Sequence, residues 1–360
     1  MQAPIINHLP VTVIRRERLL PFPGEITVRE GQSVRPTDVI AEVDLSLEHM
    51  VLNLTRGLGI SVERVDKYVQ RSVGDRVAKG DVIAGPVGLG RRVVRAPSDG
   101  KLIAVGGGKV LLQVEKPPSE LRAGIPGEVR EVVEDVGVVI ETTGSLIQGV
   151  WGNGKADMGI MQVLAKSPDD ELAPGQLDVS FRGAVIMGAY CANPDTLKVA
   201  AEILLRGLIL ASMPYYLVPI AKRQPFPIVV IEGFGRLPMN SAAYQLLTSN
   251  PKRDVAIYAE PLDHYTGSRP EVIILLPEEV RAEPPVDIEY WRPGLAVRVT
   301  HPPYVTKIGT LLTLPDGLVT FPNGVRAPGA KVRLESGEDV MIPLANLQVL
   351  KTTSSHRERE

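Results

Sequence analysis

The sequence predicts a multidomain, β-rich chain that contains one α/β domain. Three observations lead to this class. The chain has 34 glycines and 31 prolines but only 4% aromatic residues, a composition that favours short strands joined by tight turns. A small glycine-centred unit is repeated in the first third of the chain. Between residues 183 and 277, apolar strands alternate with helix signals, as expected for an α/β layer with a mostly parallel sheet.

Length and composition exclude several classes of protein. The 360 residues provide for two or three domains, and 44% hydrophobic with 23% charged residues is ordinary for a globular chain. One cysteine can form neither an internal disulfide nor a multi-cysteine metal site. A net charge of −2 creates no global field that attracts nucleic acid or an anionic membrane. Without a signal peptide or an apolar run of membrane-spanning length, we expect a cytoplasmic protein that does not contact membranes.

The repeated unit follows a pattern of glycine turn, strand start, second turn and strand. Residues 31–41 align in step with residues 74–84. A second repeated element places a glycine before an alternating strand, and it occurs in residues 23–26, in residues 97–102 and again in residues 126–129. Because one hairpin cannot bury a core by itself, repeated units of this kind are predicted to stack their strands.

The second copy resembles a biotinyl/lipoyl-type barrel-sandwich hybrid. Residues 73–84 match that family's Gly-Asp-x-Val-x-x-Gly-x motif, and residues 96–104 match its Ala-Pro-x-x-Gly motif. The resemblance implies a barrel-sandwich-hybrid β domain over residues 1–120, in which residues 52–68 form a short helical insert. Carriers of this family hold a modified lysine at the hairpin tip between the two motifs. Residues 85–92 contain no lysine, so the resemblance implies a scaffold module without a cofactor.

The middle of the chain is predicted to change from β structure to α/β structure. Residues 121–182 are a β-rich, glycine-punctuated extension, and residues 183–280 are the α/β domain. Asn193, Pro194 and Asp195 form a strong helix start, which we expect to lead into a helix over residues 197–213. A second helix is predicted over residues 240–247. The predicted strands of the domain cover residues 184–187, 227–231, 253–258 and 271–276.

The C-terminal part is predicted to be a separate small barrel. Residues 281–290 are a linker with acidic residues and prolines. Residues 291–351 begin like a KOW motif, the SH3-like barrel unit of transcription and ribosomal proteins, and residues 352–360 are expected to be a disordered tail. Two prolines replace the glycine usual before the second KOW strand. The segment from residue 291 onward carries a net charge of +3 and no aromatic stacking platforms, which implies an SH3-like barrel with weak affinity for nucleic acid.

One candidate ligand corner lies where an apolar strand ends at Glu232. Open α/β sheets bind ligands at the carboxyl ends of their strands, and Gly233 and Gly235 would let the backbone approach a ligand closely. A structural interpretation competes with this one. The two glycines would then make only a tight turn, and Glu232 would cap the helix that starts at Asn240 or pair with an arginine, either Arg236 or Arg269.

A second candidate corner contains Cys191 and Asn193 at the start of the capped helix, where free N–H groups could hold a small anion. The competing interpretation treats Cys191 as a buried small hydrophobic residue, because no base lies near it in the sequence. No triad, carboxylate pair or metal-ligand spacing is recognisable in the sequence, so we expect no cofactor and no metal.

These observations favour a non-catalytic, multidomain binding or adaptor protein of the cytoplasm, with proteins as its partners. One alternative is an enzyme or small-ligand sensor that takes a small anionic ligand in the α/β domain cleft. Another alternative is a transcription- or ribosome-associated factor that acts through the KOW-like module. The sequence leaves the oligomeric state open.

Overall fold

A computed structural model describes residues 2–43, 49–88, 90–114, 119–263, 267–276, 284–285 and 288–352. The protein is β-rich, with 46% of the described residues in strands and 14% in helices. The strands form one large mixed sheet with parallel strands and several small antiparallel sheets, which confirms the β-rich class. Among the described residues, no helix has the length and apolar character that a membrane span requires.

The large sheet joins strands from the N-terminal, middle and C-terminal parts of the chain. Adjacent strands are parallel in the pairs β16–β17, β17–β18, β18–β19 and β2–β29. The other adjacent pairs in the order given next are antiparallel. In order across the sheet, the strands are β15 (Trp151–Gly152), β19 (Ile228–Phe234), β18 (Gly207–Met213), β17 (Ala184–Met187), β16 (Ala156–Val163), β20 (Asp254–Tyr258), β21 (Glu271–Leu275), β14 (Gly137–Gln148), β2 (Ile5–Leu19), β29 (Leu347–Lys351), β23 (Ala296–Val299), β24 (Ile308–Thr313), β27 (Gly329–Leu334) and β28 (Asp339–Pro343).

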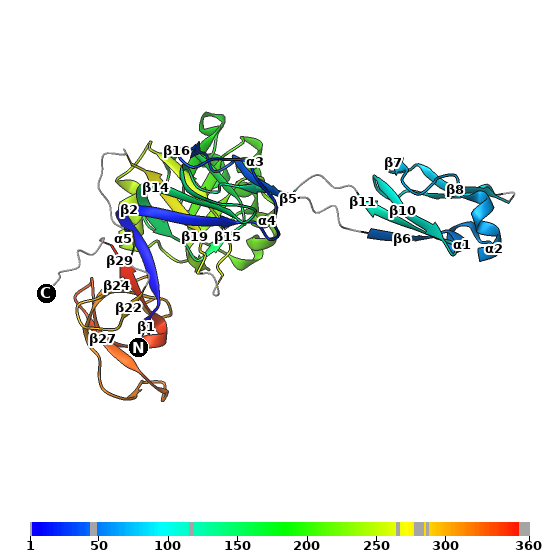
Figure 1. The fold of residues 1–360 in the computed structure, drawn as a ribbon. Helices are drawn as coiled ribbons and strands as arrows, with labels where there is room; N and C mark the ends of the chain where they lie inside the picture. Colours follow the sequence, from blue (N-terminus) through cyan, green and yellow to red (C-terminus); the bar gives the residue numbers. More distant parts are fainter. Residues whose placement is uncertain are drawn as a thin grey trace.

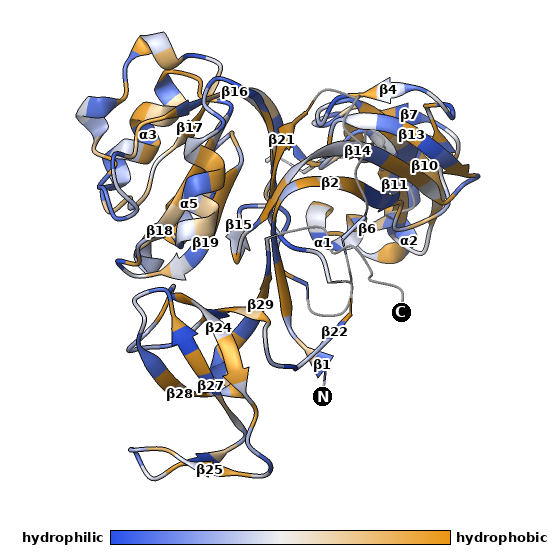
Figure 2. Ribbon diagram, turned by 90° about the vertical axis from the view of Figure 1, so that its left-hand side faces the viewer, coloured by the Kyte–Doolittle hydropathy of each residue, from blue (hydrophilic) through white to orange (hydrophobic). Residues whose placement is uncertain are grey.

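Helices cover both faces of the parallel strands. On one face, Ala243 and Leu247 of α5 (Ser241–Thr248) pack against Ile231 and its neighbours. On the other face, α3 (Pro194–Glu202) and α4 (Val218–Arg223) pack against the alternate strand residues. Because helices cover both faces of the layer, β17, β18 and β19 are buried on both sides, and nearly all of their residues are apolar. Figure 2 shows α5 lying against β18 and β19.

The predicted helix over residues 197–213 is wrong in its second half. Helix α3 ends at Glu202, Leu204 adopts a φ of 60°, and the chain then enters β18. Every residue of β18 is buried between β17 and β19. At Gly207, an added Cβ would lie 2.5 Å from the Ile257 Cδ1 atom, so a larger residue would require the Ile257 side chain to shift. The helix-cap signal located the start of α3, whereas burial in the sheet determines where it ends.

The predicted internal repeat is confirmed by matching hydrogen bonds. The Gly31 N–H donates to the Val129 carbonyl at 2.8 Å, and the equivalent Gly74 N–H donates to the Leu102 carbonyl at 2.8 Å. Both glycines have a positive φ, 78° for Gly31 and 97° for Gly74. Further along each copy, the backbone N–H of an aspartate closes the second turn by donating to a backbone carbonyl. Asp38 donates to the Arg35 carbonyl and Asp81 to the Ala78 carbonyl, each at 3.0 Å.

The two copies are nested within each other. In the second copy, the antiparallel strands β8 (Val82–Val87) and β9 (Arg92–Arg95) are joined directly by residues 88–91. In the first copy, the equivalent pair is β5 (Val39–Val43) and β12 (Ser119–Arg122). Residues 44–118 separate these two strands, so the second copy is inserted into a hairpin of the first. We call residues 49–114 the inner domain.

The inner domain has its own core and its own sheets. Strands β6 (His49–Asn53), β11 (Lys109–Val114), β10 (Gly100–Gly106) and β7 (Arg76–Val77) form one sheet. Its two short helices, α1 (Leu54–Leu58) and α2 (Val62–Val65), lie within the predicted helical insert. Figure 1 shows the inner domain apart from the rest of the molecule. The first copy instead continues through β13 (Gly127–Val133) into β14 of the large sheet.

The C-terminal strands, which we call the C-terminal module (residues 291–351), are joined to the rest of the large sheet. Strand β29 pairs in parallel with the start of β2, where Ile5 lies opposite Val349. Within the predicted linker, β22 (Glu289–Tyr290) pairs with β1 (Gln2–Ala3), while residues 281–283 and 286–287 lie outside the described residues, as do residues 353–360 of the tail. Figures 1 and 2 show these strands beside the parallel layer.

Candidate functional site

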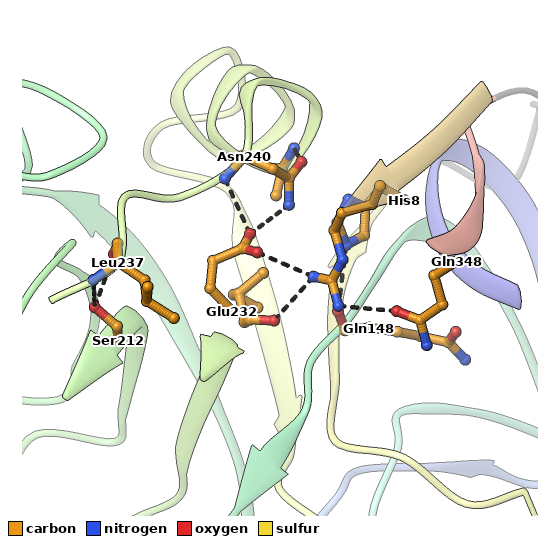
Figure 3. Close-up of polar contacts among 10 residues, drawn as sticks. His8, Gln148, Ser212, Glu232, Leu237, Asn240 and Gln348 are labelled. Carbon is orange, nitrogen blue, oxygen red and sulfur yellow. Dashed lines mark hydrogen bonds and ion pairs between the residues drawn. The ribbon is translucent and has the colours of Figure 1, made fainter. Parts of the chain in front are cut away.

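Glu232 lies buried where the parallel layer meets the C-terminal module. Its Oε2 atom is 3.1 Å from the Nη1 atom of Arg298 in β23, and the two side chains are only 1% and 3% exposed. Arg298 also donates to the Ile231 carbonyl at 3.3 Å and to Gln348 Oε1 at 3.0 Å. Figure 3 shows Glu232 and Gln348 on either side of this guanidinium. The carboxylate therefore has a protein partner that comes from another part of the chain.

The arginines that the sequence suggested as partners lie elsewhere. Arg236 is 64% exposed, lies 3.8 Å from Glu171 and stacks over the Tyr190 ring, and Arg269 lines a cavity described below. Neither forms an ion pair with Glu232 in the described part of the chain. A pair separated by 66 positions in the sequence, such as Glu232 and Arg298, leaves no local signal.

The helix-capping interpretation of Glu232 agrees with the structure. Glu232 Oε1 accepts a hydrogen bond from the Asn240 backbone N–H at 2.9 Å and a second one from the Asn240 side chain. Asn240 Oδ1 in turn accepts from the Ala243 N–H at 2.9 Å and caps α5. Burial raises the pKa of Glu232, while the Arg298 charge and the Asn240 hydrogen bonds oppose the rise.

Gly233 and Gly235 are required by the backbone conformation of the turn after β19. Their φ angles are 142° and 111°, which side-chain-bearing residues rarely adopt. An added Cβ would meet nothing within 4 Å at Gly235, and only the Leu237 Cδ1 atom at 3.6 Å at Gly233. The glycines therefore make the tight turn that leads to Asn240.

Cys191 and Asn193 are also engaged inside the protein. Cys191 is fully buried, its Sγ atom lies 3.9 Å from the Asn193 carbonyl, and burial raises the pKa of the thiol to about 11. A thiol with that pKa stays protonated at neutral pH and is a poor nucleophile. Asn193 Oδ1 accepts from the Asp195 N–H at 2.8 Å and caps α3.

The two corners lie at the same edge of the sheet, because Tyr190 bridges to Ser212 and Ser212 lies opposite Gly233. They are two strands apart. Neither corner lines either of two cavities, of about 830 and 680 Å³, in the described part of the chain. The polar side chains of the two corners contribute to helix caps or to the Glu232–Arg298 ion pair, so their observed roles are structural.

An aromatic surface lies at this same edge, and sequence reasoning did not single it out as a site. Tyr215 and Tyr216 are 72% and 63% exposed. The Tyr215 ring meets Phe234 edge-on at 5.3 Å, Phe234 meets Trp151 at 6.1 Å, and Tyr216 donates to the backbone carbonyl of residue 192 at 2.7 Å. With Tyr190 beneath Arg236, these five aromatic residues form the aromatic edge. It holds five of the 16 aromatic residues of a chain poor in them.

A line of buried polar groups extends from the Glu232–Arg298 pair into the sheet. His8 in β2 is 2% exposed, and its Nε2 atom lies 3.3 Å from the Gln148 carbonyl. Burial and, secondarily, the Arg298 charge lower the pKa of His8 to about 3, so the imidazole is neutral in the folded protein. Gln148 donates to Glu271 Oε1 at 3.1 Å, and Arg16 donates to Glu271 Oε2 at 2.9 Å. Figure 3 shows His8 and Gln148 close to the pair.

The cavity of about 830 Å³ lies beside this line of polar groups. Asn7 is 9% exposed, and its Oδ1 atom has no hydrogen-bond partner. Arg269 is half-buried and forms no ion pair among the described residues; burial and the nearby Arg298 charge lower its pKa. The charged residues that line the cavity are Arg15, Arg16, Glu17, Arg269 and Glu271. Its lining thus offers one arginine without a carboxylate partner.

Comparisons with known proteins identify no relative from which a role could be inferred. No protein-family model matches the chain, and no curated protein matches its sequence. The features of the structure that bear on function are the aromatic edge, the cavity and the distribution of charge.

Proposed function

We propose that the protein is a non-catalytic, multidomain binding protein that acts as an adaptor for other proteins in the cytoplasm. The aromatic edge carries this proposal. Tyr, Trp and Arg dominate the binding energy of protein interfaces, because they offer large, rigid contact areas with a polar group. At this edge, Tyr215 and Tyr216 expose most of their surface beside Arg236. The buried Glu232 and Cys191 show no arrangement for catalysis.

We infer the finer architecture from the nested repeat and from the strand order of the C-terminal module. The nested repeat, with its glycine turns and lysine-free hairpin tip, supports two barrel-sandwich-hybrid units that serve as scaffold and not as carriers. The antiparallel order β29–β23–β24–β27–β28 supports an SH3-like barrel at the C-terminal end. An adaptor with this architecture would combine a partner surface on the parallel layer with modules held at its two ends.

Photocrosslinking in cells tests the adaptor proposal. A photoreactive phenylalanine analogue at position 215 is expected to crosslink one predominant protein, because this side chain is the most exposed member of the aromatic edge. The matched control is position 179, which is also 72% exposed but precedes β17, at the opposite edge of the sheet. Equal crosslinking from both positions, or no protein adduct from position 215, would contradict the proposal.

A small-ligand sensor is the second candidate, and the cavity beside Arg269 favours it. A cavity with a few convergent polar groups is typical of ligand sites, and the guanidinium of Arg269, which forms no ion pair among the described residues, suits a small anion. Asn7 Oδ1, which also lacks a partner, would accept a hydrogen bond from a hydroxyl group on that anion.

A thermal-shift screen of nucleotides, sugar phosphates and carboxylates tests the sensor candidate. At about 100 times its dissociation constant, a bound compound should stabilise the protein by about 2.7 kcal/mol. Arg269→Gln should abolish that shift, while Arg236→Gln, which removes an exposed arginine outside the cavity, should leave it unchanged. If no compound stabilises the protein, or if Arg269→Gln responds as the wild type does, this candidate is rejected.

A further inference from the structure

The charge of the protein is distributed unevenly. The inner domain, residues 49–114, contains eleven basic and five acidic residues and has a net charge of +6. The remaining 294 residues contain 29 basic and 37 acidic residues, a net charge of −8. The overall charge of −2 therefore conceals a basic domain attached to an acidic chain. Figure 1 shows that this domain lies apart from the large sheet.

Five basic side chains gather at one end of the inner domain, which we call the basic end. They come from α1, α2, the short helix η1 (Asp66–Tyr68) and the tip of the β8–β9 hairpin, and Figure 1 shows α1 and α2 at the end farther from the large sheet. Helix α1 packs against β9 and α2, which brings these elements together. The five residues are Arg56, Arg64, Lys67, Arg91 and Arg92, and all of them are exposed.

These five cations have no ion-pair partner among the described residues. Arg92 lies over the end of α1, because a Cβ added at Gly59 would be 2.3 Å from its Nη1 atom. Two acidic residues at this end, Glu63 and Asp66, reduce its net charge to +3. The surface is therefore an exposed cluster of cations that form no ion pairs within the described part of the chain.

The other acidic residues of the inner domain serve its turns. Asp75 accepts the Ser72 N–H at 2.8 Å, Asp81 accepts the Ala78 N–H at 3.2 Å, and Asp99 accepts the Lys79 N–H at 2.7 Å. These carboxylates close the loops around β7, away from α1 and α2. They therefore do not offset the positive charge of the basic end.

The C-terminal module, which resembles a nucleic-acid-binding unit, has a different arrangement of charge. Five of its seven described basic residues form ion pairs: Arg292, Arg298, Lys331, Arg333 and Lys351. Side chains that are already paired release few counterions when they approach a phosphate. The structure therefore favours the inner domain, and not the C-terminal module, as a surface for a polyanion.

We propose that the basic end binds the phosphate backbone of double-stranded nucleic acid without reading its sequence. Exposed, unpaired arginines form bidentate contacts with phosphates and release condensed counterions. Binding of single strands relies on aromatic residues that stack on bases. Tyr68 is the one aromatic residue of the inner domain and packs into its core, so the domain offers no stacking platform. The acidic remainder of the chain would repel the duplex and keep contacts at the basic end.

Fluorescence anisotropy with the full chain and a short labelled duplex tests the proposal. Each neutralised phosphate contributes about −0.9 to the slope of log affinity against log salt. Five contacts predict a slope of about −4.5, and binding that weakens by two to three orders of magnitude between about 50 and 200 mM salt. The variant Arg56→Gln/Arg64→Gln/Arg91→Gln/Arg92→Gln should reduce the slope to about −1, because each lost phosphate contact removes about one unit.

The matched control is Lys252→Gln/Arg253→Gln/Lys307→Gln/Arg326→Gln, which removes four exposed positive charges outside the inner domain. It changes the net charge equally and should keep the wild-type slope. Both variants alter exposed side chains and should retain the wild-type unfolding temperature. A wild-type slope shallower than about −1, or equal losses in both variants, would overturn the proposal. Binding to polyglutamate without binding to the duplex would also overturn it and would assign an acidic protein as partner.

Discussion

Replacement of Arg298 by methionine is expected to lower the free energy of unfolding by about 3–5 kcal/mol. The substitution leaves the Glu232 carboxylate, 1% exposed, without its cationic partner in a site with little water. It also removes the hydrogen bond to Gln348, which links β23 to β29. Urea unfolding followed by circular dichroism measures the loss, at a pH near 7.5 where His8 is neutral in both the folded and the unfolded state.

Two controls accompany this prediction. Arg292→Met removes an arginine that is 65% exposed and 3.6 Å from Glu289, so it should change stability by no more than about 0.5–1 kcal/mol. Glu232→Leu combined with Arg298→Met replaces the pair by apolar groups and should recover much of the stability. A loss below about 1 kcal/mol for Arg298→Met would contradict a buried pair, because that is the effect of an exposed one.

Acidification from pH 6.5 to 4.5 is expected to destabilise the protein through His8 by about 2.3 kcal/mol, because the loss approaches about 1.36 kcal/mol for each pH unit once the pH lies well below 6.5. Burial and the Arg298 charge lower the pKa of His8 from 6.5 to about 3 in the folded protein. The unfolded chain therefore binds a proton that the folded protein does not accept. The stability contributed by neutral His8 is complete above pH 6.5 and is lost as the pH falls toward 3.

Chemical unfolding at several pH values checks this effect. Carboxylates titrate mainly below pH 5, so the interval between about pH 5 and 6.5 reports chiefly the contribution of His8, about 1.6 kcal/mol. His8→Gln should flatten the pH dependence in this interval, whereas His301→Gln, at an exposed position, should leave it unchanged. If His8→Gln and the wild type lose stability in parallel, His8 is not the group that titrates.

Features encoded in neighbouring residues could be predicted from the sequence. The repeat was visible because each copy places a glycine at a positive φ and an aspartate at a second turn. The helix predicted over residues 240–247 corresponds to α5. By contrast, the end of α3 depends on how β18 is buried between two other strands, and local helix signals contain no information about that burial.

Long-range relations explain what sequence reasoning missed. The nesting of the two copies depends on the pairing of β5 with β12 across the inserted inner domain, a relation that no sequence window contains. The partner of Glu232 comes from β23 because β29 and β23 continue the large sheet beside β2. The charge of the inner domain was an exception, since counting basic and acidic residues between positions 49 and 114 would have revealed it.

The coupling free energy between Glu232 and Arg298 tests most directly whether this corner is a structural junction or a ligand site. A double-mutant cycle with Glu232→Leu, Arg298→Met and the double variant isolates this coupling from the other effects of each substitution. A buried, hydrogen-bonded pair at 3.1 Å predicts a coupling of about 2–3 kcal/mol without any added ligand. Additive losses, with a coupling below about 0.5 kcal/mol, would contradict the structural role of Glu232.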